Sequence, residues 1–442
     1  MPLIARLAIA ALLFGASSFA YCAGSVRFEH SGQPVLSGEP IPVVVHGLPA
    51  NQVVELVASR RDMTTAGRTL QSRSQFQADA QGTLDTARQP SIGPSYLGTD
   101  ASGPFWSMRP VDSAGTPPVV GIQLEAMVDG TVVGSDTRQL EDVKPEVVAD
   151  PRLSGSLLYR PGSSTPLKEI VIILGGSEGG NSTARAVGPR FARAGYAAFG
   201  LAYHSPNYGR GAEIEGLPSS FKALPLERIE WARSWLSTQP GLGGQTISLW
   251  GVSKGAEVAL AAADRMPWIH SVVAVVPSDV AWAAFGPGVS GDDEGSGLSW
   301  QGAGLPWTPY RGMGQAIERI SKGQPAGFRQ VHDQGRLAHP DRALGARLGL
   351  KAKMPVLLIG GSDDQLWPSG QMSLALGAAR LDRKLPTTVV VFDRVGHALS
   401  GDGWSATTWS GVGGDPQATA GAQRLAWGHT LDFLAQSASS GP

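Results

Sequence analysis

A serine lies between two glycines where an apolar run meets an alanine-rich run, in the segment Leu249-Trp250-Gly251-Val252-Ser253-Lys254-Gly255. An apolar run followed directly by a helix-forming run predicts a strand that turns sharply into a helix. Glycines suit such a turn because side chains would collide there. In this G-x-S-x-G pattern the serine stands on the turn with its hydroxyl free to attack a carbonyl. The segment therefore predicts an α/β fold with a nucleophilic serine, Ser253.

The same pattern occurs a second time, in Gly175-Gly176-Ser177-Glu178-Gly179, after the apolar run 170–174. With 58 glycines among 442 residues, the pattern alone does not choose between the two serines. A serine hydroxyl is a weak nucleophile, and it needs a base to take its proton and an acid to orient that base. The choice therefore depends on where histidines and acids follow strands.

Candidate partners follow two late apolar runs. His397 comes just after the run 389–392, and Asp363 and Asp364 follow the run 356–360. The carboxyl ends of adjacent parallel strands are where an open α/β sheet keeps its active site. Ser253, Asp364 and His397 give the chain order of α/β-hydrolases. We assign them as nucleophile, acid and base, with Asp364 preferred to Asp363 and with helix capping as the alternative role of the aspartate pair.

The first glycine-rich turn takes a different role. Ser177 would give the same chain order, but its turn precedes the helical run 184–194, where this fold places an oxyanion loop. We predict that the backbone N–H groups of Ser177, Glu178 and Lys254 form the oxyanion hole. His204 follows a strand near this site, and we interpret it as structural. Histidines, the single cysteine and acids show no metal-ligand spacing, so we predict no metal and no cofactor.

The length of 442 residues favours two domains. Residues 24–150 contain short β-type runs separated by Gly, Pro, Asn and Asp, a pattern typical of an immunoglobulin-like β-sandwich. Residues 151–442 alternate apolar and helical runs, which predicts a doubly wound α/β-hydrolase domain. The expected strands of the second domain are 169–174, 197–203, 246–250, 271–276, 356–360 and 388–392, and the expected helices are 184–194, 226–238, 256–265, 369–381 and 418–435.

One stretch, residues 279–350, interrupts the alternation. It carries five scattered aromatic residues among many glycines and prolines: Trp282, Phe285, Trp300, Trp307 and Tyr310. Long insertions inside compact domains are usually functional or disordered. We interpret this one as a lid that lines an apolar substrate pocket; the alternative is a loop region packed on the surface.

The first 23 residues are typical of a cleaved export signal, with Arg6 before an apolar stretch and the small residues Ser18 and Ala20 at a cleavage site. Cleavage after Ala23 and an uncleaved membrane anchor are the alternatives. We expect a periplasmic or secreted protein. Cys22 is the only cysteine, so an internal disulfide is excluded, and lipid attachment at Cys22 is disfavoured by the preceding tyrosine. The formal net charge of −1 gives no attraction to nucleic acid.

Several segments resemble the family of acyl-CoA thioesterases and bile acid-CoA:amino acid N-acyltransferases, and the exported chain looks like a bacterial-type member. The similarity spans both domains and lies in residues 103–108, 202–203, 251–257, 363–367, 396–397, 413–418 and 426–427. The resemblance implies nucleophile, acid and base roles for Ser253, Asp364 and His397, and hydrolysis of fatty acyl-CoA through an acyl-enzyme. Acyl-transferring members carry cysteine as the nucleophile, so serine here indicates hydrolysis.

Three functions follow as hypotheses. The first is a serine thioesterase acting on acyl-CoA or another acyl thioester, in which Lys254 or Arg311 contacts the phosphates of CoA. The second is an exported carboxylesterase or amidase that uses the same triad on oxygen esters or amides, because CoA thioesters are kept in the cytosol. The third is a binding or envelope-structural protein whose hydrolase site is idle.

Overall fold

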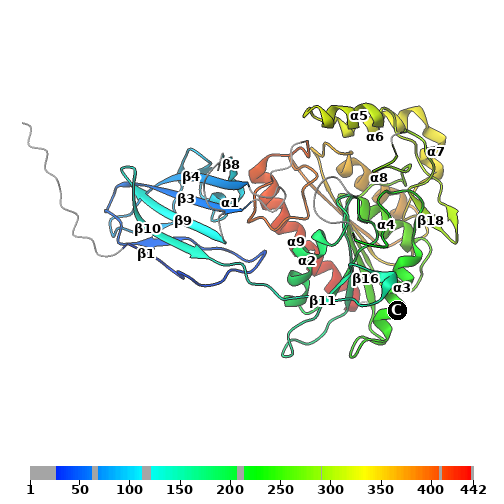
Figure 1. Ribbon diagram of the computed structural model, residues 1–442, viewed down its shortest axis with the longest axis horizontal. Helices are drawn as coiled ribbons and strands as arrows, with labels where there is room; N and C mark the ends of the chain where they lie inside the picture. Colours follow the sequence, from blue (N-terminus) through cyan, green and yellow to red (C-terminus); the bar gives the residue numbers. More distant parts are fainter. Residues whose placement is uncertain are drawn as a thin grey trace, which may run out of the picture.

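The computed structural model describes residues 26–61, 68–111, 121–206, 214–289, 291–407 and 411–439. The expected export signal at residues 1–23, with Cys22, lies outside these ranges. An amino-terminal β domain lies beside a larger α/β domain, and the long helix α9 (Pro416–Ser439) runs along the α/β domain near their junction (Figure 1).

Antiparallel sheets build the amino-terminal domain. Alternation of buried and exposed residues, as along β9, predicts strands with one face on a core. A five-stranded sheet has the order β10 (Thr131–Arg138), β9 (Ile122–Val128), β3 (Val53–Arg61), β4 (Thr69–Gln77), β8 (Arg109–Val111). A three-stranded sheet has the order β1 (Arg27–Phe28), β2 (Val44–His46), β5 (Leu84–Asp85), and a small hairpin joins β6 (Ser91–Ile92) to β7 (Leu97–Gly98). Apolar residues of both larger sheets share one core with the short helix α1 (Gly103–Trp106).

An eight-stranded sheet forms the centre of the second domain. Its order is β11 (Glu146–Val147), β12 (Leu157–Tyr159), β14 (Ala197–Leu201), β13 (Ile170–Leu174), β16 (Ile247–Val252), β17 (Val272–Val275), β20 (Val356–Gly361), β21 (Thr387–Phe392). β12 pairs antiparallel with β11 and β14, whereas the strands from β14 to β21 are parallel. The predicted fold class, an α/β-hydrolase domain after an all-β domain, is confirmed.

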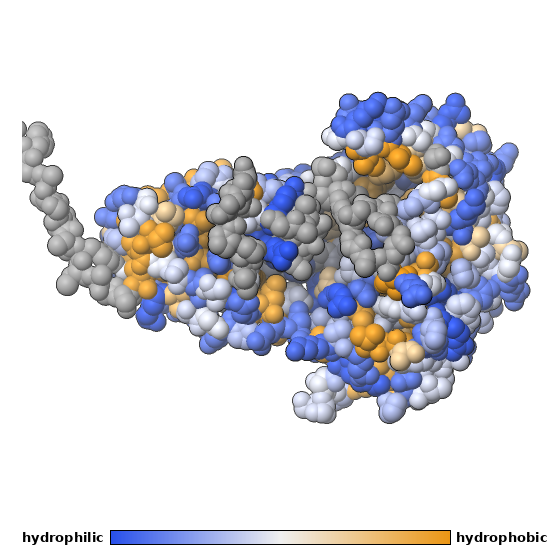
Figure 2. Space-filling view, in the orientation of Figure 1, coloured by the Kyte–Doolittle hydropathy of each residue, from blue (hydrophilic) through white to orange (hydrophobic). Residues whose placement is uncertain are grey.

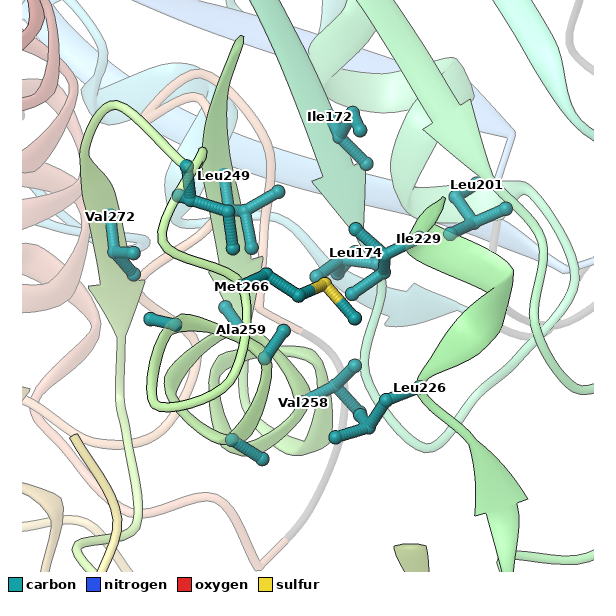
Figure 3. Close-up of a cluster of buried hydrophobic side chains, with 14 of the residues drawn as sticks. Ile172, Leu174, Leu201, Leu226, Ile229, Leu249, Val258, Ala259, Met266 and Val272 are labelled. Carbon is teal, nitrogen blue, oxygen red and sulfur yellow. The ribbon is translucent and has the colours of Figure 1, made fainter. Parts of the chain in front are cut away.

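Helices cover both faces of this sheet. Alternate residues of its central strands point to opposite sides, and the side chains on both sides are apolar and need to be buried. Ile172 and Leu174 of β13 pack toward α3 (Glu227–Ser237), α4 (Lys254–Ala263) and α8 (Ser369–Leu381). Figure 3 shows part of this core, with Leu249 and Met266 against the same cluster. Ile173 instead packs toward α2 (Ser182–Arg193) and α9. The central strands are thereby buried on both sides, and their carboxyl ends are fixed relative to one another.

The insertion, described at residues 279–289 and 291–350, contains short helices and strands and also pairs with the short strand β15 (Leu224–Pro225). Its elements are β18 (Leu298–Trp300), β19 (Ala303–Gly304), α5 (Met313–Ser321), α6 (Phe328–Ala338) and α7 (Pro340–Gly345). The outer face of α5 is hydrophilic, and apolar surface appears beneath it (Figure 2). Trp282 and Tyr310 are buried and stack in parallel, 5.4 Å apart between ring centres. These two aromatic side chains belong to an apolar cluster that joins the insertion to Leu366, Trp367 and Met372 of the hydrolase domain.

Candidate active site

Ser253 stands on the turn between β16 and α4. Its backbone has φ 58° and ψ −122°, a positive-φ conformation outside the usual regions that costs energy for a residue with a side chain. A Cβ at Gly251 would lie 2.3 Å from the Gly255 carbonyl oxygen, and one at Gly255 would lie 2.1 Å from that of Leu174. The two glycines therefore let the turn close against itself and against β13. Only 7% of Ser253 is exposed.

A continuous chain of hydrogen bonds runs from Ser253 to Asp364. The Ser253 Oγ atom lies 2.8 Å from Nε2 of His397, and Nδ1 of His397 lies 2.7 Å from Oδ2 of Asp364. His397 follows β21, and Asp364 follows β20, the neighbouring strand. When Nδ1 carries the ring proton and donates a hydrogen bond to Asp364, Nε2 is unprotonated and can accept the proton of Ser253. The three residues predicted from the sequence thus meet with the geometry of a catalytic triad.

The two aspartates after β20 have different environments. Asp364 is fully buried, and its Oδ1 atom accepts a 2.9 Å hydrogen bond from the Leu366 N–H. Asp363 is exposed and accepts hydrogen bonds from the Gly414 N–H at 2.9 Å and from the Gln365 side chain. Asp364 is therefore the carboxylate that faces His397, while Asp363 ties its own turn to the loop before α9.

The glycine-rich loop after β13 lies directly against the nucleophile. A Cβ at Gly176 would lie 3.2 Å from the Ser253 Cβ, so the absence of a side chain allows this approach. The Gly176 N–H donates to Oε1 of Glu178 at 2.9 Å, and the Ser177 carbonyl lies 3.3 Å from Nε2 of His204. Ser177 and Glu178 thus lie on the loop beside the nucleophile, and the oxyanion role of their N–H groups, with that of Lys254, stays a prediction. The Gly176 N–H is already used in its bond to Glu178.

His204 and the preceding tyrosine hold this loop from behind. The Tyr203 hydroxyl donates to the Gly175 carbonyl, and the Gly180 N–H donates to the His204 carbonyl at 2.8 Å. Burial lowers the pKa of His204 to about 4, so its ring is neutral near pH 7. This placement agrees with the structural interpretation of His204.

The side chain of Lys254 points into the protein. Its ammonium pairs with the Glu257 carboxylate and lies 5.2 Å from the centre of the Phe221 ring. The other Glu257 oxygen accepts a 3.1 Å hydrogen bond from the Trp282 N–H. The side chains of Lys254 and Glu257 are 3% and 0% exposed. The expectation that Lys254 contacts CoA phosphates is therefore wrong in this structure, because its charge is already paired inside the core. Arg311, the other candidate, is exposed.

An aromatic side chain packs against the base. The Trp367 ring meets the His397 ring edge to face, 4.9 Å between centres, and His332 of α6 packs against Trp367. Burial lowers the pKa of His332 to about 4, so this histidine adds no positive charge beside His397 near pH 7. No local sequence pattern distinguishes His332, whose neighbours come from distant segments.

Within the described ranges, no group of three or more His, Cys, Asp or Glu residues is arranged to hold a metal ion. The same residues contain no helix that is both long and apolar enough to cross a membrane.

A mainly parallel sheet flanked by helices, with a serine on a strained strand-to-helix turn and a buried His–Asp pair after later strands, defines an α/β-hydrolase. Two family models match the chain: the acyl-CoA thioester hydrolase/BAAT N-terminal region at residues 38–133 and the BAAT/acyl-CoA thioester hydrolase C terminal at residues 224–440. The chain belongs to this acyl-CoA thioester hydrolase/BAAT family, as the resemblance predicted.

Named relatives match along most of their length. Mouse acyl-coenzyme A thioesterase 5 is 27% identical over 424 residues, which cover 90% of this chain and 93% of the relative. Human acyl-coenzyme A thioesterase 1 is 28% identical over 430 residues, with the same two coverages. Mouse bile acid-CoA:amino acid N-acyltransferase is 29% identical over 260 residues, 54% of this chain and 59% of that protein. Among solved structures, a putative dienelactone hydrolase from Klebsiella pneumoniae is 16% identical with a TM-score of 0.40, covering 64% of this chain and 92% of its own.

Proposed function

We propose that this protein is a serine hydrolase that cleaves acyl thioesters, releasing fatty acid and CoA from fatty acyl-CoA through an acyl-enzyme on Ser253. The observation that carries the proposal is the hydrogen-bonded chain from Ser253 through His397 to Asp364. Membership of the acyl-CoA thioester hydrolase/BAAT family supports the thioester substrate.

Acylation begins at the short contact between Ser253 and His397. Nε2 of His397 takes the hydroxyl proton as Oγ bonds to the thioester carbon, and Asp364 stabilises the resulting imidazolium. The negative charge that develops on the carbonyl oxygen is held by the backbone N–H groups of Ser177, Glu178 and Lys254. The carbon–sulfur bond then breaks, and the imidazolium gives its proton to the departing thiolate. The acyl group remains on Ser253.

Deacylation repeats these steps with water. His397 takes a proton from a water molecule whose oxygen bonds to the acyl carbon, the bond to Ser253 Oγ breaks, and the imidazolium returns a proton to Oγ. The free fatty acid leaves and the enzyme is regenerated. Serine at the nucleophile position, where acyl-transferring relatives are expected to carry cysteine, supports water as the acceptor.

The direct test is turnover of a series of acyl-CoAs, from short to long chains, by the wild type and by Ser253→Ala. We expect turnover by the wild type and its loss in the variant, and a fluorophosphonate probe should label Ser253 in the wild type. Ser177→Ala serves as the comparison, because it removes the rival hydroxyl and keeps every backbone N–H; its Ser253 should still be labelled. Undiminished turnover by Ser253→Ala would overturn the proposal.

Matched thioesters and oxygen esters of the same acyl chain separate the thioesterase from a carboxylesterase or amidase with the same triad. We expect the thioester to be the better substrate. Adding glycine or taurine and analysing the products tests acyl transfer, for which we expect no conjugate.

We also propose that the protein is exported, on the basis of the apolar amino-terminal stretch with its small-residue cleavage site. Sequencing the mature amino terminus of the native protein tests this proposal. A mature chain that begins near residue 21 or 24 is expected, and a chain that retains Met1 would contradict it.

A further inference from the structure

The loop that carries His397 reaches from the hydrolase domain into the neighbouring domain. It begins after β21 and ends at α9. Its base is closed by local contacts: the His397 N–H donates to the Val412 carbonyl at 2.8 Å, and Val395 forms a β-bridge with Gly414. Between these contacts the loop extends as far as Trp404.

Trp404 belongs to the hydrophobic core of the amino-terminal domain. It is 6% exposed, and its ring centre lies 5.9 Å from that of Phe105, a fully buried residue of α1. The next residue, Ser405, accepts a 2.7 Å hydrogen bond from Arg60 of β3. The histidine loop is therefore anchored in a domain that provides none of the triad residues.

A single side chain connects this anchor to the catalytic end of the loop. Gln423 of α9 donates through Nε2 to the Ala398 carbonyl at 2.5 Å and accepts through Oε1 from the Gly403 N–H at 2.9 Å. Ala398 directly follows His397, and Gly403 directly precedes Trp404. Gln423 is 4% exposed. Ala398 and Gly403 are thus both hydrogen-bonded to the side-chain amide of Gln423.

A second connection ties this assembly to α1. Arg424 donates through Nη1 to the Gly403 carbonyl at 3.0 Å and to the Ser102 hydroxyl of the amino-terminal domain at 2.6 Å. Figure 1 shows α1 facing α9 across the junction of the two domains. Movement of Trp404 away from Phe105 would therefore displace Gly403, Gln423 and the start of the loop at Ala398.

We infer that the amino-terminal β domain positions the base of the triad, with Trp404 as the positioning residue through which it acts. The inference rests on the proposed function, because it assigns His397 the role of base. The described residues 396–407 of this loop form no helix or strand, which explains why an anchor is needed: a segment without regular structure gains conformational freedom unless packing removes it. Misplacing a catalytic group by about 1 Å typically costs about 100-fold in rate.

The test compares Trp404→Ala with Trp404→Phe and with Leu84→Ala in the full-length protein. Leu84 is a fully buried residue of β5 in the same amino-terminal core, on the three-stranded sheet, whereas α1 packs on β3 and β4 of the five-stranded sheet. Its truncation therefore controls for general destabilisation of that domain. All variants are assayed below the temperature at which their circular dichroism begins to change. We expect Trp404→Ala to lower kcat about 100-fold with little change in KM. Trp404→Phe should retain most of the wild-type kcat, and Leu84→Ala should keep kcat near the wild type.

Gln423→Leu provides a second route if Trp404→Ala does not fold. It breaks the link between Ala398 and Gly403 without touching the domain core, and we expect the same loss of kcat. The inference is overturned if folded Trp404→Ala, or Gln423→Leu, keeps the wild-type kcat, or if Leu84→Ala loses as much as Trp404→Ala. The rate of fluorophosphonate labelling at Ser253 reports on the triad whatever the natural substrate. Slow labelling only in the Trp404 and Gln423 variants would support the inference even if acyl-CoA is not cleaved. Activity that survives Ser253→Ala would instead contradict the proposed function itself.

Discussion

Asp364 and His397 form a buried pair in which Oδ2 and Nδ1 are 2.7 Å apart, with the carboxylate 0% exposed. An asparagine at position 364 would offer an amide that holds the imidazole in the wrong tautomer and no longer stabilises its positive form. We expect Asp364→Asn to lower kcat by about 10⁴-fold, measured with the best acyl-CoA of the series. Asp363→Asn is the matched control, since an asparagine there can still accept from Gly414. A loss of similar size in both variants would contradict the assignment of Asp364.

Gly255→Ala tests the tightness of the elbow. A Cβ at this position would lie 2.1 Å from the Leu174 carbonyl oxygen and 2.4 Å from that of Gly175, and backbone atoms give way only if β13 moves. We expect a loss of about 3 kcal/mol in the free energy of unfolding, measured by urea denaturation, and a loss of activity. Gly428→Ala in α9 is the control, because nothing lies within 4 Å of its Cβ. There the better helix former should raise stability by up to about 1 kcal/mol.

Lys254→Met should destabilise the protein through its partner. Burial lowers the pKa of Lys254 and raises the pKa of Glu257, and the attraction between the two opposes both effects. Removing only the ammonium leaves a carboxylate buried without its counter-charge, which costs about 3–5 kcal/mol. The double variant Lys254→Met, Glu257→Gln removes both charges, and we expect it to recover most of that loss in urea unfolding. Additive effects of the two substitutions would show that the ion pair does not couple them.

Stability should fall as the pH rises through the titration range of Glu169. This carboxyl group is 0% exposed, and burial raises its pKa from 4.5 to about 7, although hydrogen bonds from Ser248 and Thr246 work in the opposite direction. The folded state then binds the proton more tightly than the unfolded state, so this stabilisation is complete below pH 4.5 and is lost as the pH approaches 7.

Glu169→Gln should remove this dependence. The variant is expected to be more stable than the wild type at pH 8, by about 3 kcal/mol, and to differ little from it at pH 5. Urea unfolding measures the free energy of unfolding of both proteins at the two pH values. Taking the difference between variant and wild type cancels the contributions of other titrating groups. An equal difference between variant and wild type at both values would show that Glu169 does not titrate in this range.

The α/β core was predictable because its signals are local. An apolar run followed by a helical run indicates a buried parallel strand and the helix that covers it. The predicted helix 369–381 coincides with α8. Strand β16 continues to Val252, two residues beyond the prediction, because Gly251 still pairs with β13 and β17 before the turn. The chain order of Ser253, Asp364 and His397 followed from the order of these strands.

The parts that were not predicted depend on contacts between distant segments. The helices α5 to α7 were missed, although Met313, Ala316, Ile317 and Ile320 have the spacing of one helix face, because glycines and prolines around them suggested loops. The pairing of Glu257 with both Lys254 and the Trp282 N–H joins two segments with no shared pattern. The same holds for Trp404, which follows His397 in the chain and packs in the other domain.

Helix α4 begins at the residue after the nucleophile, and all ten of its residues are buried. The aligned peptide dipoles of a helix place roughly half a positive charge at its amino terminus. Because α4 is buried, solvent screens this charge only weakly. The resulting field acts on the carbonyl oxygen of the bound substrate, an atom that thioesters, esters and amides have in common. Because the elbow favours charge on this oxygen whatever the leaving group, discrimination among acyl donors must arise away from it, where the rest of the substrate is held.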